Sequence, residues 1–147
     1  MGLTQKLKNK NVFLDTAPLI YYIEENHKYS PVLNKLFLAN SKGNFMFQTS
    51  VITLLEVLVH PMRENEHQLV EEYKNILCNS PSIVIQDINI DIVVSAAFLR
   101  AKYGLKTPDS IQVASALYLS AEYFLTNDIR LKIVNEIEVL VLDELVE

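Results

Sequence analysis

Cysteine and glycine are scarce in this chain of 147 residues, which has one cysteine and three glycines. The single Cys78 excludes an internal disulfide, and it is compatible with the reducing, cytoplasmic location that we expect. Few glycines and a hydrophobic fraction of 50% exclude a disordered or low-complexity chain. No apolar run approaches the roughly 18–20 residues that span a bilayer, and the basic N-terminus lacks a signal-peptide core, so no membrane association is expected.

Acidic charge is concentrated at the C-terminal end. The formal net charge is −5, and the stretch 135–147 holds five acids and no base. The remaining 13 acids match the 13 bases of residues 1–134. An acidic protein is normally a poor candidate for binding nucleic acid, but here the excess is local and the argument is weak.

Short apolar stretches alternate with helical patterns. Strands are predicted at 11–15, 44–49, 82–88, 123–126 and 138–142. Helices are predicted at 16–26, 30–43, 50–60, 66–78, 89–104, 107–121 and 128–134. This order predicts a single α/β domain over residues 1–147, with three α/β/α layers and a central, mainly parallel sheet. Ligands bind such sheets beyond the carboxyl ends of the strands, which makes strand-end residues the candidates for a site.

Proline and glycine mark two of the predicted helix ends. Pro61 is expected to stop the helix 50–60, and Gly104 to end the helix 89–104. The second of these helices carries apolar residues on one face, namely Ile90, Val93, Val94, Ala97 and Ala101.

Three aspartates stand where elements begin or end. Asp15 ends the first strand and Asp128 follows the fourth, and either side chain could cap the helix that comes next. Asp109 lies in the first turn of a helix, after the expected N-cap Thr107, where an acid favours the helix dipole by roughly 0.3–1 kcal/mol. For each residue taken alone, capping and a functional role both stay open.

Glu56 stands in a helix that is otherwise almost entirely apolar. Only Thr53 and His60 also interrupt the pattern, and their spacing puts all three on one stripe. The helix is therefore predicted to be buried, where a carboxylate is unfavourable unless it is paired or binds a metal. A partner arginine, or an exposed position at a seam, is the alternative. His60, at the helix end beside Pro61, is expected to be structural.

Acids gathered at one sheet edge repel each other unless a cation neutralises them. Mg²⁺ and Mn²⁺ prefer carboxylate and water oxygens. The three histidines form no HxxxH pair and there is no thiolate cluster, so zinc is not expected. An acidic magnesium or manganese site suits phosphoryl transfer, in which the metal activates water and orients the phosphate.

Four stretches together resemble the PIN domain: FLDTAPLIYYIE, TSVITLLEVLVHP, LKTPDSIQVASAL and FLTNDIRLK. They occur in the family's order and spacing, and the resemblance runs from Asn11 to about Leu142. It implies a metal-dependent endoribonuclease that hydrolyses RNA phosphodiesters with water as the nucleophile. Small members are often VapC-type toxins of type II toxin–antitoxin pairs, so a small antitoxin partner and a homodimer are also implied.

The resemblance also implies the site residues. Asp15, Glu56 and Asp109 match the family's three central acids, and Asp128 matches a more variable fourth. These four are expected to be catalytic and to hold Mg²⁺ or Mn²⁺. Four further positions match residues that line the pocket: Thr16, Gln112, Thr126 and Asn127. Gln112 departs from the family, in which histidine is frequent at this position. Basic residues that flank the acids could contact phosphates or simply be solvated: Arg100, Lys102, Lys106 and Arg130.

Other functions are also considered. A haloacid-dehalogenase-type phosphatase needs a second aspartate two residues after the first, where this chain has Ala17. A receiver domain needs a pair of acids at the end of the first strand, which FLDTA lacks. A non-catalytic PIN-like scaffold that binds RNA or protein is the main alternative, although all four acids are present. Cys78 is expected to be a core thiol. Whether the nuclease is a toxin or a housekeeping enzyme stays open.

Overall fold

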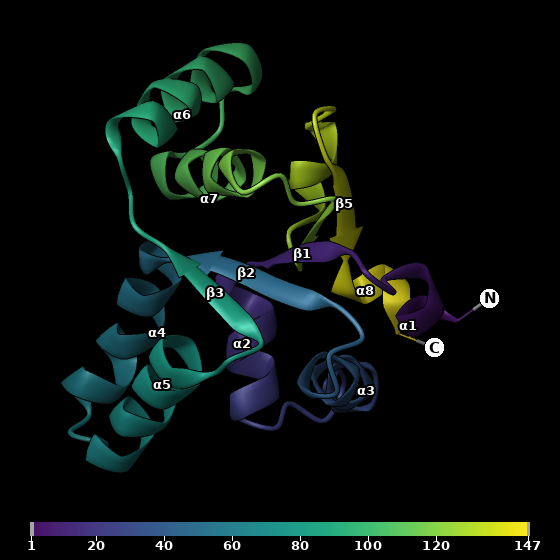
Figure 1. Ribbon diagram of the computed structural model, residues 1–147. Helices are drawn as coiled ribbons and strands as arrows, with labels where there is room; N and C mark the ends of the chain where they lie inside the picture. Colours follow the sequence, from purple (N-terminus) through teal and green to yellow (C-terminus); the bar gives the residue numbers. More distant parts are fainter. Residues whose placement is uncertain (1, 147) are drawn as a thin grey trace.

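Five short strands form one parallel sheet in the computed structural model, which describes residues 2–146 (Figure 1). The strands are β1 (Asn11–Leu14), β2 (Met46–Ser50), β3 (Ile83–Gln86), β4 (Tyr123–Thr126) and β5 (Glu138–Val141). Their order is β3-β2-β1-β4-β5, and every neighbouring pair is parallel. The predicted mainly parallel sheet is confirmed, and β1 lies at its centre between β2 and β4.

Helices cover both faces of the sheet, which confirms the three-layer prediction (Figure 1). One face carries α2 (Thr16–Ile23), α3 (Ser30–Ser41), α4 (Val51–Arg63) and α5 (His67–Asn79). The other carries α6 (Ile90–Tyr103), α7 (Thr107–Tyr118) and the 3₁₀ helix η1 (Ile129–Ile133). Two short helices near the chain ends, α1 (Leu3–Lys6) and α8 (Leu142–Leu145), lie near α3. Among the described residues, no helix is both long and apolar enough to cross a membrane.

Two separate apolar cores lie above and below the sheet. Alternate residues of β1 enter different cores: Phe13 stacks on Phe124 beneath α6 and α7, whereas Val12 and Leu14 pack toward α2 to α5. Because both faces are covered, the strands read as continuous apolar runs rather than as an alternating pattern.

Several sequence-based expectations are wrong in their local detail. Helix α4 continues through Pro61 to Arg63, since a proline this close to the end removes only one of the last intrahelical hydrogen bonds. The same helix is not buried all round: Leu55, Val59 and Met62 are 60%, 44% and 55% exposed. Cys78 is exposed at the end of α5 and is not a core thiol.

The apolar face of α6 that the sequence pattern identifies points away from the sheet. Its core residues are instead Ile92, Ala96 and Leu99. The prediction that Gly104 ends this helix is confirmed, and Gly104 has the left-handed φ of 71° that a C-cap of this kind requires.

The acidic C-terminal end is tied to the rest of the chain by lysines. Four ion pairs join it to distant positions: Lys102–Glu136, Lys6–Glu138, Lys28–Asp143 and Lys132–Glu144. All are at the surface, where one pair contributes roughly 0–1 kcal/mol. The local negative excess is therefore largely matched by nearby lysines.

Candidate functional site

Asp15 stands at the carboxyl end of the central strand and caps α2. Its Oδ1 accepts a hydrogen bond of 2.9 Å from the backbone N–H of Thr16, and its own N–H donates to the carbonyl of Leu125 on β4. The neighbouring strand supplies Thr126, whose hydroxyl donates to Oδ2 of Asp15 at 2.8 Å. Burial raises the pKa of Asp15 above its ordinary value, although the hydrogen bonds from these threonines work in the opposite direction. Asp15 is thus the N-cap of α2 as well as a candidate site residue.

Glu56 lies one helical turn and a half into α4, and its side chain is connected to α2. The hydroxyl of Thr16 donates to Oε1 of Glu56 at 2.5 Å. Glu56 is exposed, in line with the alternative of an exposed seam and not with the predicted buried helix. It nevertheless lies near the first acid, since its charge adds to the upward shift of the Asp15 pKa. Thr16, expected to line the pocket, is therefore the bridge between the two acids.

Asp109 occupies the first turn of α7 and is half-buried. Burial raises its pKa, and the charges of Asp15 and Asp128 raise it further, whereas Arg130 and Lys106 oppose the shift. The helix begins one residue earlier than the expected N-cap Thr107 implies: Lys106 is at the N-cap, Thr107 is the first helical residue, and no side-chain capping bond is made. Asp109 therefore lies near Asp15 and Asp128, which follow the neighbouring strands β1 and β4.

Asp128 follows β4 and caps η1. Both of its carboxylate oxygens contact the guanidinium of Arg130, at 3.0 Å from Nε to Oδ1 and 2.7 Å from Nη2 to Oδ2. These contacts hold the pKa of Asp128 below its usual value. Of the four predicted acids, this one already has a cationic partner within the chain.

Gln112 is fully buried on α7, and both the nitrogen and the oxygen of its side-chain amide are hydrogen-bonded. Its Nε2 donates to Thr53 at 2.7 Å and to Oδ1 of Asp15 at 3.3 Å, while its Oε1 accepts from the hydroxyl of Ser50. Ser50 in turn caps α4 by accepting from the N–H of Ile52. The residue predicted to line the pocket therefore connects Asp15 with the start of α4.

The side chain of Asn127 is used away from the acids. Its Nδ2 donates to the hydroxyl of Tyr29, and its Oδ1 accepts from the backbone N–H of Asp143. Tyr29 also donates to the Asp143 carboxylate. These bonds join the loop after β4 to the N-terminal end of α3 and to α8, so the structure gives Asn127 a bracing role beside the predicted pocket.

Some residues of this site carried no clear signal in the sequence. Ser50 is a serine immediately before a helix, which indicates an N-cap but not a partner for Gln112. Thr53 is visible as a polar break in an apolar helix, and the structure buries it completely between Thr49 and Gln112. The pairing of Arg130 with Asp128 follows from the turn at the start of η1, which a linear pattern does not show.

The side chains around Asp15 offer carboxylate and hydroxyl oxygens, which are ligands that Mg²⁺ and Mn²⁺ select, whereas Gln112 presents its amide nitrogen to Asp15. Within residues 2–146, however, no three side chains of the His, Cys, Asp and Glu types lie close enough together to hold a metal ion as they stand. Burial raises the pKa of Asp15 and of Asp109, and repulsion from neighbouring carboxylates raises both pKa values further; a bound cation would offset these effects. The donor chemistry therefore fits a divalent cation, although the ligands are not preassembled.

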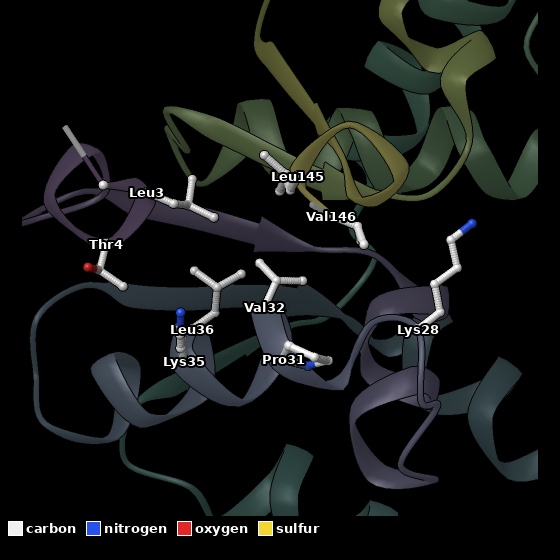
Figure 2. Close-up of a pocket in the computed structure, with 10 residues that line it drawn as sticks. Leu3, Thr4, Lys28, Pro31, Val32, Lys35, Leu36, Leu145 and Val146 are labelled. Atoms are coloured by element: carbon white, nitrogen blue, oxygen red, sulfur yellow. The ribbon is translucent and has the colours of Figure 1, made fainter.

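A separate pocket of about 450 Å³ lies between α1, α3 and α8 (Figure 2). Its wall is mainly apolar, with Leu3, Val32 and Leu36 among its residues, and Lys28 and Lys35 also line it. None of the four acids lines this pocket. It is thus distinct from the acidic edge of the sheet.

The family model of the PIN domain matches residues 12–137. All four predicted acids lie within this range. A search among curated proteins gave no match.

Solved structures of similar fold include three from bacterial toxin–antitoxin systems. VapBC2 of Rickettsia felis, bound to promoter DNA, is 17% identical, with a TM-score of 0.68 and coverage of 89% of this chain and 98% of that chain. A toxin–antitoxin complex from Klebsiella pneumoniae is 22% identical, with a TM-score of 0.64 and coverage of 89% and 97%. VapC20 of Mycobacterium tuberculosis, a toxin that cleaves the sarcin–ricin loop, is 14% identical, with a TM-score of 0.64 and coverage of 77% and 86%. At these identities the likeness establishes a shared fold.

Proposed function

This chain belongs to the PIN domain family, and on that premise we propose that it is a divalent-metal-dependent endoribonuclease. The observation that carries the proposal is the arrangement at the carboxyl end of β1, where Asp15 accepts hydrogen bonds from Thr16 and Thr126 and the Thr16 hydroxyl donates to Glu56. Asp109 lies near this group, since burial and then the charges of Asp15 and Asp128 raise its pKa. Acids that repel each other lower the stability of that edge of the sheet, and acids with such perturbed pKa values are typical of functional sites.

In this proposal Asp15, Glu56 and Asp109 hold Mg²⁺ or Mn²⁺, directly or through water. When bound, the ion supplies an activated water and neutralises charge on the phosphate. The chain's own contribution is orientation. Asp15 is fixed from two sides by the Thr126 hydroxyl and the Thr16 N–H, and the Thr16 side chain directs Glu56 toward it. Asp128 is the fourth acid, and it forms an ion pair with the exposed Arg130 at the edge of the site.

The test is RNA cleavage by the purified protein in Mg²⁺, Mn²⁺ or EDTA, alongside Asp15→Asn and Asp109→Asn. Both variants should lose at least about 100-fold in rate, as expected when a group that stabilises the transition state is removed. Equal cleavage by all three proteins would indicate a contaminating ribonuclease. If wild type and variants all fail to bind Mn²⁺ and to cleave, the non-catalytic RNA- or protein-binding scaffold is the better description.

We further propose that the protein is the toxin of a toxin–antitoxin pair. The support is that the solved structures of similar fold include a VapBC complex and a toxin–antitoxin complex, and this chain covers 98% and 97% of the matched chains. A small antitoxin protein is then expected as a partner. Induced expression should arrest growth for wild type but not for Asp15→Asn, and growth arrest by both would contradict the link to nuclease activity.

A homodimer through α6 also forms part of the proposal. Ile90, Val94 and Phe98 recur every four residues on one face of α6 and are 81%, 64% and 60% exposed. The helix is acidic in its first turn, at Asp91, and basic in its last turn, at Arg100 and Lys102. Two copies of α6 packed antiparallel about a two-fold axis would cover the apolar face and place opposite charges together.

A further inference from the structure

Arg130 is bound to Asp128 by two parallel hydrogen bonds, through Nε and Nη2. The backbone N–H of Arg130 donates to the same carboxylate, at 3.0 Å to Oδ1. Arginine has five N–H donors in a rigid fork, so two are engaged here and three are left over. The Arg130 side chain is 71% exposed, so the unused edge of its guanidinium is accessible to solvent.

Hydrogen bonds connect the Asp128–Arg130 pair to Asp15, the central acid of the site. The backbone N–H of Asp128 donates to the Thr126 hydroxyl at 3.2 Å, and this hydroxyl donates to Oδ2 of Asp15. The position of Arg130 is therefore fixed relative to Asp15 through only two intervening residues. Burial raises the pKa of Asp109, and the positive charge of Arg130 acts in the opposite direction.

The Asp128–Arg130 pair is better suited to binding an anion than to binding a metal cation. A carboxylate that is engaged on both oxygens by an arginine has little capacity left for a metal ion, and the guanidinium charge repels one. An arginine anchored on one edge can instead present its other edge to a phosphate, in the bidentate geometry that guanidinium groups favour.

We propose that Arg130 is a phosphate-binding residue of the nuclease site and that Asp128 anchors it rather than coordinating a metal ion. The inference rests on the proposed function, and it revises the sequence-based expectation that Asp128 is a metal ligand. The metal ligands are then Asp15, Glu56 and Asp109, and Arg130 supplies the positive charge on the rim where a fourth metal-binding acid was expected.

The first measurement is the affinity for a short labelled single-stranded RNA as a function of salt, in Ca²⁺, with a gel to verify that the RNA stays intact. Arg130→Ala should weaken binding about 10-fold and reduce the slope of log K against log salt by about 0.7, as expected for one lost phosphate contact to single-stranded RNA. Arg130→Lys keeps the charge but not the fork, and it should give an intermediate affinity with an unchanged slope.

The matched control is Lys132→Ala. Lys132 lies two residues further along η1, is exposed, and pairs with Glu144. The substitution removes the same charge from the same 3₁₀ helix on the side of α8. It should leave both the RNA affinity and the salt slope close to those of wild type. Equal effects of Arg130→Ala and Lys132→Ala would overturn the assignment, as would the absence of RNA binding by wild type.

The second measurement is Mn²⁺ binding by calorimetry, without RNA. Asp109→Asn should lower the Mn²⁺ affinity at least about 10-fold, whereas Asp128→Asn should leave it within about twofold of wild type. Asp128→Asn should still weaken RNA binding, because an unanchored Arg130 is no longer positioned. A loss of Mn²⁺ affinity in Asp128→Asn as large as that in Asp109→Asn would overturn the anchoring role.

The two hypotheses fail in different ways. If Asp15→Asn and Asp109→Asn change neither Mn²⁺ binding nor cleavage, the proposed function fails. If both variants lose Mn²⁺ binding and cleavage while Arg130→Ala behaves as Lys132→Ala does, only the role of Arg130 fails.

Discussion

Gln112 donates a hydrogen bond from Nε2 to Oδ1 of Asp15, and it makes this contact from the interior of the protein. Its amide also donates to Thr53 and accepts from Ser50, at the junction of β2 and α4. A residue in this position keeps the central carboxylate oriented without being accessible to a substrate. At this position, where the resemblance makes histidine frequent, we expect the buried Gln112 to position Asp15.

Replacing Gln112 by methionine should test that role, since the volume is nearly kept and the amide is lost. The Ser50 hydroxyl would lose its acceptor and Thr53 would lose one of its two donors, which should lower the free energy of unfolding by about 1–3 kcal/mol. Mn²⁺ affinity should fall about 10-fold because Asp15 loses one of its orienting bonds.

The control for Gln112→Met is Ser115→Ala, one turn further along α7. Ser115 is fully buried, and its hydroxyl only donates to the Ile111 carbonyl of the same helix. Urea denaturation should show a loss of about 1 kcal/mol or less, and Mn²⁺ affinity should not change. If Gln112→Met changes stability but leaves Mn²⁺ affinity as it is in wild type, Gln112 is structural and does not position Asp15.

The pH dependence of stability should report the buried charge of Asp15. Its pKa is raised in the folded state, so folding favours the protonated form, and this contribution is lost as pH rises through the folded pKa. In EDTA at pH 8, Asp15→Asn should therefore melt at a higher temperature than wild type. The difference should shrink as pH falls through the raised pKa of Asp15.

The same melting experiment with added Mn²⁺ separates a metal site from simple charge repulsion. Mn²⁺ should raise the melting temperature of wild type at pH 8 and leave Asp15→Asn unchanged, because only the folded wild type binds the ion. Glu64→Gln removes one exposed negative charge at the C-cap of α4 and should respond to Mn²⁺ as wild type does. A wild type that is more stable than Asp15→Asn in EDTA at pH 8 would contradict the pKa argument.

The sheet could be predicted from the sequence because strands covered on both faces must be apolar along their whole length. The stretch Val12, Phe13 and Leu14 is such a run, and each residue is fully buried. Helices α1 and α8 could not be predicted, since four residues are too few to show a helical period. The single-domain assignment over residues 1–147 stays a prediction.

The positions of the aspartates could be predicted, but their partners could not. Asp15 and Asp128 follow strands, and parallel strands end at one edge of a sheet. Which hydroxyl or guanidinium meets each carboxylate depends on side-chain directions that a linear pattern does not contain. The same limit explains Glu56: the apolar surroundings in the sequence suggested burial, whereas part of the apolar surface of α4 is exposed.

Asn127 and Thr126 are adjacent, and their substitutions should separate bracing from site function. Asn127→Ala removes the bonds to Tyr29 and to the Asp143 N–H, which should lower the free energy of unfolding by about 1–2 kcal/mol. Thr126→Val removes the hydroxyl that donates to Asp15 and should lower Mn²⁺ affinity about 10-fold. Calorimetry should find the Mn²⁺ affinity of Asn127→Ala close to wild type. A 10-fold loss in that variant would instead place Asn127 in the pocket, as the sequence predicts.

The exposed face of α6 gives the last prediction, which concerns self-association. Val94 is 64% exposed, so Val94→Glu should cost the folded protomer little, but in an antiparallel α6 pair it would place like charges together at the apolar centre. Light scattering after size exclusion should show a dimer for wild type and a monomer for the variant. Leu38→Glu makes the same kind of change on α3, where Leu38 is 57% exposed, and should leave the dimer intact. A dimer that survives Val94→Glu would mean that α6 is not the interface, and a wild type that is monomeric at all concentrations would leave this face to another partner.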